Sequence, residues 1–131
     1  MKNNEFMDIQ KQIDFWVKSA EEDFAAAQSL VDKDHFRHSL FFAHLAIEKM
    51  LKAHVVNRTK DVPPKVHDIV RLAQLGGINL SKEQKNLLLE FRVYQLEGRY
   101  PDSQQLPLST AFVKNEIARA KGIIEWLKAQ L

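Results

Sequence analysis

Three charged side chains occur within an apolar stretch of the sequence, where an isolated charge would be unfavourable. They are Glu48, Lys49 and Lys52, in the segment SLFFAHLAIEKMLKAH at residues 39–54. Glu48 precedes Lys52 by four residues, so the two side chains can pair on a helix, and His44 lies along the same edge. Two interpretations remain open: a local ion pair at the rim of a core helix, or a polar binding site flanked by apolar surface.

The sequence RYPD at residues 99–102 supplies a second group of candidate binding residues. Arg99 follows Gly98, where a predicted helix ends, so its guanidinium can bond the last helical carbonyls or reach a phosphate. Pro101 keeps Tyr100 out of the helical conformation. Taken alone, the segment also fits an exposed loop that binds nothing.

Other catalytic motifs are absent from the sequence. The five histidines form no HExxH pattern and have no paired carboxylates at ligand spacing, so we expect no metal. Glycine-rich phosphate loops, a serine nucleophile elbow and cysteine are all missing. We therefore expect no cofactor.

The composition is typical of a globular protein. The 131 residues are 45% hydrophobic and 27% charged, which predicts one domain over residues 1–131 with a core that needs no disulfide. The net charge of +2 is too small to indicate nucleic-acid binding by itself. The sequence has neither a signal peptide nor the roughly 20 apolar residues of a transmembrane helix, so we expect a cytoplasmic protein without a membrane partner.

Hydrophobic periodicity predicts an all-α fold, because no segment alternates apolar and polar residues over the length of a strand. Long helices are expected from about Ile9 to Val31 and from about Phe36 to Val56. The second helix is apolar on almost every side, which places it at the centre of a bundle or against a partner chain.

The remaining helices are predicted from the capping and turn residues at their ends. A short helix is expected within residues 66–77, whose final glycine pair suits a left-handed cap. Ser81–Gln84 has capping-box spacing for a fourth helix, which should end near Gly98. A last helix begins after Ser109 or Thr110. The expected architecture is an up-and-down four-helix bundle with one extra short helix.

Three segments, in this order and spacing, resemble a HEPN (higher eukaryotes and prokaryotes nucleotide-binding) domain. They are the pattern FxAxxAxEKxLKA at residues 41–53, the His67-Asp68 pair before an apolar helix, and the RYP sequence that begins at Arg99. The resemblance extends from about Trp16 to Trp126. It implies a helical bundle that commonly dimerises and is often encoded beside a minimal nucleotidyltransferase, as a toxin–antitoxin pair.

Family members without an RNase motif are thought to bind nucleotides or to serve as partner subunits. In that case Lys49, Lys52 and Arg99 would together form a small anion site, and Tyr100 would stack on a base. Asp102 belongs to the same candidate site. Alternatively, Glu48 pairs with Arg99 and holds the loop in place, and the sequence does not choose between these two arrangements.

A metal-independent HEPN RNase is the alternative function. Such members carry an arginine followed a few residues later by a histidine, and Arg37 and His44 fit that spacing. In RNase members, however, the motif usually lies near the third long helix, and residues 87–102 contain no histidine here. We therefore favour the nucleotide-binding or partner-subunit interpretation.

The second helix also predicts an oligomeric state. Phe41, Phe42 and Leu45 add apolar surface to this helix that one bundle need not cover. Two-fold symmetry is the commonest way to bury such a face, so we expect a symmetric homodimer.

Overall fold

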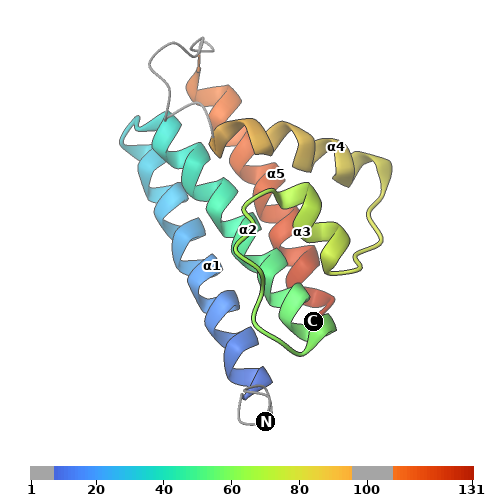
Figure 1. Ribbon diagram of the computed structural model, residues 1–131. Helices are drawn as coiled ribbons and strands as arrows, with labels where there is room; N and C mark the ends of the chain where they lie inside the picture. The colour runs from blue at the N-terminus through green and yellow to red at the C-terminus, as the bar shows by residue number, and fades with distance from the viewer. Residues whose placement is uncertain (1–7, 96–107) are drawn as a thin grey trace.

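The computed structural model describes residues 8–95 and 108–131, and no strand occurs within these ranges. The helices are α1 (Ile9–Asp32), α2 (Phe36–Thr59), α3 (Ile69–Leu75), α4 (Lys82–Phe91) and α5 (Thr110–Ala129), with a 3₁₀ turn at Arg92–Gln95. Helices α1, α2 and α5 run up and down beside one another, and α4 lies at a steep angle to α5 (Figure 1). The predicted all-α bundle with an extra short helix, α3, is confirmed.

Helices α1 and α2 form an antiparallel pair (Figure 1). Helix α1 begins after Asp8, whose carboxylate caps the helix by accepting a hydrogen bond from the Lys11 N–H. One face of α1 is buried, whereas more than half of the residues of α2 are buried. Because α1, α3 and α5 all contact α2, the second helix occupies the predicted central position.

The segments around α3 and α4 follow the turn signals of the sequence until the end of α4. Gly77 has a φ of 66°, which confirms the left-handed residue predicted after α3. The Ser81–Gln84 capping box is present at the start of α4. The prediction that α4 continues to near Gly98 is wrong, because the α-helix ends at Phe91 and tightens into the 3₁₀ turn. Buried Tyr94 in that turn packs edge-to-face on Phe91, with ring centroids 5.0 Å apart.

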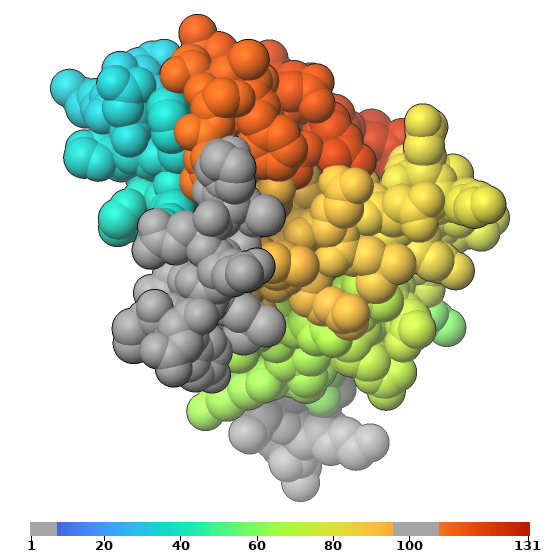
Figure 2. Space-filling view, turned by 90° about the horizontal axis from the view of Figure 1, so that it is seen from above, coloured from blue at the N-terminus to red at the C-terminus, as the bar shows by residue number. Residues whose placement is uncertain are grey.

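A polar network joins this turn to α4 and α5. The Tyr94 hydroxyl donates to the buried Glu116 carboxylate over 2.6 Å, and Arg119 donates to both Glu116 and Glu90. Figure 2 shows α4 and the beginning of α5 adjoining at this end of the bundle. Across the two described ranges, no helix is both long enough and apolar enough to span a bilayer.

Candidate functional site

Glu48, Lys52 and His67 form a charged cluster at the side of the central helix. Nζ of Lys52 lies 3.1 Å from Oε2 of Glu48, so the ion pair predicted from their spacing is confirmed. Nδ1 of His67, from the connection between α2 and α3, lies 2.9 Å from the same oxygen. Glu48 and Lys52 are only 3% and 7% exposed, whereas the His67 side chain is 58% exposed. The cluster therefore connects a buried carboxylate to a surface imidazole.

Trp16 of α1 forms one wall of this cluster. Nζ of Lys52 lies 5.2 Å from the centroid of the Trp16 ring, a cation–π distance. Within the described part of the chain, the buried indole Nε1 of Trp16 and the buried Oε1 of Glu48 have no hydrogen-bond partner. The cluster thus contains one buried donor and one buried acceptor that make no hydrogen bond to the described residues.

Lys49 does not join this cluster. Its Nζ lies 2.7 Å from Oδ2 of Asp23 and donates to the Ser19 hydroxyl over 2.8 Å, so it connects α2 to α1. Lys49 and Lys52 are therefore paired with different carboxylates. Of the other predicted binding residues, Arg99, Tyr100 and Asp102 lie outside the described residues.

The residues of the alternative RNase motif, Arg37 and His44, both lie on α2. They are separated by almost two helical turns. His44 is completely buried, at 0% exposure, whereas Arg37 is partly exposed. The structure therefore places the two side chains on one helix but does not present the imidazole to solvent.

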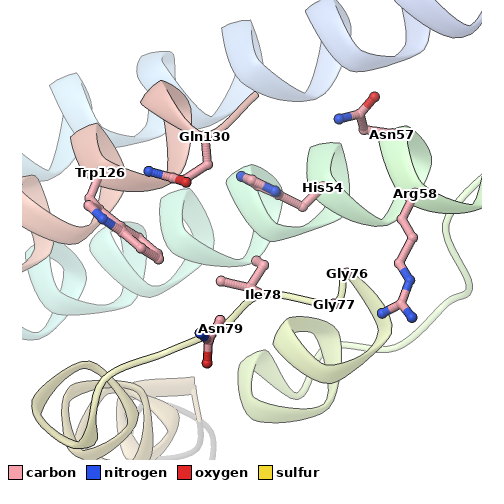
Figure 3. Close-up of a pocket in the computed structure, with 9 residues that line it drawn as sticks. All are labelled: His54, Asn57, Arg58, Gly76, Gly77, Ile78, Asn79, Trp126 and Gln130. Carbon is pink, nitrogen blue, oxygen red and sulfur yellow. The ribbon is translucent and has the colours of Figure 1, made fainter.

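A pocket of about 370 Å³ lies where the C-terminal parts of α2 and α5 meet the turn after α3, and we call it the end pocket (Figure 3). Its walls come from these three segments. The lining residues are His54, Asn57, Arg58, Gly76, Gly77, Ile78, Asn79, Trp126 and Gln130. The sequence pattern did not single out this pocket, because only its glycine pair carried a local signal.

His54 forms the inner wall of the end pocket. Its Nε2 lies 2.7 Å from the carbonyl oxygen of Leu127 near the end of α5, and its ring points toward α5 in Figure 3. Burial lowers the pKa of His54, and the hydrogen bond to the Leu127 carbonyl offsets only part of this effect. The ring is therefore neutral near pH 7, and Nε2 donates its proton to the carbonyl.

Metal ligation receives no support within residues 8–95 and 108–131, where no group of three or more acidic or histidine side chains could hold an ion.

Comparisons with known proteins agree with this fold. The chain is similar to TT1696 from Thermus thermophilus, with a TM-score of 0.80, 17% identity, and coverage of 92% of this chain and 98% of that one. It is also similar to ST0689, an archaeal HEPN homologue, with a TM-score of 0.74, 20% identity, and coverage of 90% and 96%. No curated protein matches the chain. The HEPN domain family model matches residues 13–130, nearly the whole chain, and this protein therefore belongs to the HEPN domain family.

Proposed function

We propose that this HEPN protein acts in the cytoplasm as a nucleotide-binding or partner subunit of a minimal nucleotidyltransferase, in a toxin–antitoxin-type pair. Lys49 pairs with Asp23 and Lys52 with Glu48, so both lysines contribute to holding the bundle together. The proposed binding surface therefore centres on the exposed His67 side chain and not on these two lysines.

The orientation of His67 is the observation that carries this proposal. Nδ1 of the His67 ring contacts Glu48, and 58% of the His67 side chain is exposed, so the ring is anchored on one side while part of it can contact a partner. A ring fixed in this way loses little conformational freedom when it binds a phosphate or a polar group of a partner protein. We include Arg99, Tyr100 and Asp102 in the same binding surface, with Arg99 contacting phosphate and Tyr100 stacking on the base.

The partner role can be tested by co-expression with a minimal nucleotidyltransferase from the same genome. We expect the two proteins to co-purify as a complex, and His67→Ala to weaken the complex. His38→Ala is the matched control, since His38 is also exposed but lies in the first turn of α2. Separate elution of the wild-type proteins would contradict the partner role.

The nucleotide can be tested by calorimetry with ATP. Arg99→Ala should weaken binding by roughly ten- to a hundredfold, the effect of losing one charge-assisted hydrogen bond. Absence of heat at millimolar ATP would eliminate nucleotide binding and leave the partner role, which the co-expression experiment tests separately.

We also propose that the chain forms a symmetric homodimer. The start of α2 supplies the apolar surface, because Phe41 and Leu45 are only partly buried, although Phe42 packs against the core of its own bundle. Light scattering at micromolar concentration should give about twice the 15.2 kDa of one chain. A species of one chain's mass at that concentration would contradict the dimer.

A further inference from the structure

The end pocket differs from the His67 cluster in position and in lining residues. Its volume of about 370 Å³ falls within the range of small-molecule sites in proteins. None of its nine lining residues belongs to the cluster around Glu48, and none is in the segment that contains Arg99. A ligand bound here would therefore occupy a second site that the proposed function does not require.

The fixed charge of the end pocket is positive. Arg58 is the one permanently charged side chain among the lining residues, and no carboxylate lines the pocket. The neutral His54 ring adds no charge of its own. Within the described ranges Arg58 has no ion-pair partner, and its single hydrogen bond is a long one of 3.5 Å to the Gln74 carbonyl. Its guanidinium can therefore bind an anion in a bidentate manner.

The C-terminal ends of α2, α3 and α5 converge on this pocket, and their dipoles oppose an anion. Local donors reduce this effect, because carbonyls at these ends are already hydrogen-bonded. The Leu127 carbonyl is bonded by His54, the Leu72 carbonyl by the Gly76 N–H, and the Val56 carbonyl by the Lys60 N–H. Among the lining residues, Arg58 is the group that supplies a positive charge for an anion.

Gly77 leaves room for the Arg58 guanidinium where it now lies. A Cβ at Gly77 would be 2.1 Å from Nη1 of Arg58, so this flexible side chain would have to move. Because Gly77 has no side chain, the guanidinium lies directly against the turn after α3 (Figure 3). The cation thus lies at the edge of the pocket, with one long hydrogen bond to the Gln74 carbonyl.

The opposite wall of the end pocket provides an aromatic surface and amides. Trp126 is partly exposed and its ring extends toward Ile78 in Figure 3. Asn79 and Gln130 supply side-chain amides to the lining. An indole offers a stacking surface for a planar ring, and amides can donate and accept hydrogen bonds at its edge.

From this arrangement we propose that the end pocket binds a planar aromatic molecule that carries a phosphate or a carboxylate. Trp126 stacks on the ring, the amides of Asn79 and Gln130 bond its edge, and Arg58 binds the anionic group. A nucleotide and an aromatic carboxylate share this chemistry, and the experiment below distinguishes them.

The two tryptophans of the chain allow each site to be observed separately. In a Trp16→Phe variant, the fluorescence reports on Trp126 in the end pocket. In a Trp126→Phe variant, it reports on Trp16 beside Lys52 and the His67 cluster. We would titrate both variants with adenosine monophosphate, adenosine, nicotinate and inorganic phosphate.

We expect adenosine monophosphate or nicotinate to quench the Trp126 signal with saturation, and adenosine to bind at least tenfold more weakly than its monophosphate. Arg58→Ala should weaken binding roughly ten- to a hundredfold, and Arg58→Lys should restore part of it. Arg71→Ala is the matched control, because Arg71 is an exposed arginine on α3 that does not line the pocket.

Several results would overturn this proposal. The first is that neither adenosine monophosphate nor nicotinate quenches the Trp126 fluorescence at millimolar concentration. The second is that the Arg58→Ala variant binds as tightly as the protein with Arg58. The third is that a ligand quenches only the Trp16 fluorescence. The last result would support the proposed nucleotide surface near His67 while eliminating the end pocket, so the two proposals fail independently. Thermal unfolding of each variant, monitored by circular dichroism, separates lost binding from lost folding.

Discussion

Nδ1 of His67 lies 2.9 Å from Oε2 of Glu48, so an exposed imidazole is held by a carboxylate that is 3% exposed. The same oxygen is 3.1 Å from Nζ of Lys52, which neutralises the buried charge. The cluster therefore fixes the connection before α3 onto the central helix. It also accounts for charged residues within an apolar helix, because each buried charge has an opposite charge in contact.

Replacing Glu48 should destabilise the protein strongly. Glu48→Gln leaves Lys52 buried without a counter-charge, so we expect the free energy of unfolding in urea to fall by about 3–5 kcal/mol. Glu21→Gln is the matched control, because Glu21 and Lys128 form an ion pair in which both side chains are about half exposed. That control should change stability by less than about 1 kcal/mol.

A double replacement tests whether the uncompensated charge causes this loss. Glu48→Gln combined with Lys52→Met removes both charges and should recover most of the stability. Equal losses in the single and double variants would show that packing around Glu48, and not the buried lysine charge, is responsible.

Because His54 is buried, we expect the free energy of unfolding to decrease in mild acid. Burial lowers its folded-state pKa, so the folded protein binds the proton less tightly than the unfolded chain, which titrates near about pH 6.5. Because the unfolded state then binds more protons, this contribution is fully present above about pH 6.5 and is lost as the pH falls toward the folded pKa. Urea unfolding between about pH 7.5 and pH 5 should show this decline.

The matched variants for this pH dependence are His54→Gln and His38→Gln. The first should flatten the decline, whereas the second, at an exposed histidine, should retain it. An unchanged slope in His54→Gln would assign the acid sensitivity to other groups.

Replacing two of the glycines by alanine should change the stability of the protein in opposite directions. Gly77→Ala places a Cβ at a φ of 66°, where L side chains are strained, so we expect stability to fall by about 1–3 kcal/mol. Gly122 lies within α5, and a Cβ there meets nothing within 4 Å. Gly122→Ala should therefore raise the free energy of unfolding by about 0.5–1 kcal/mol. Urea unfolding measures both, and a stabilised Gly77→Ala would contradict the assigned turn.

The RNase alternative predicts RNA cleavage in EDTA, and we expect none from the purified protein. General acid–base catalysis requires an imidazole within reach of the phosphodiester, whereas His44 is completely buried. Single-stranded RNA incubated with wild type, Arg37→Ala and His44→Ala tests this directly. Cleavage by wild type that disappears in both variants would establish the RNase function.

The sequence alone predicted the structural features that depend on residues close together in the chain. The starts of α1 and α2, the Ser81–Gln84 capping box and the Glu48–Lys52 pair all involve residues at most a few positions apart. Helical geometry relates such residues directly, so their periodicity and cap types predict the local structure. The order of the motifs also identified the HEPN family, which the match over residues 13–130 shows.

Tertiary structure decided the contacts between distant segments. The sequence grouped Lys49 with Lys52, but the packing of α1 against α2 pairs Lys49 with Asp23 and places Trp16 on Lys52. The path of the α2–α3 connection brings His67 to Glu48, nineteen residues away.

The end pocket also depends on tertiary structure, because Arg58 and Trp126 come from different helices. The sequence around neither residue indicates a pocket. Which charges meet depends on how the helices pack and on the course of their connections. Apolar periodicity specifies which face of each helix is buried. It does not specify which helix packs against that face, because that depends on how the whole core assembles.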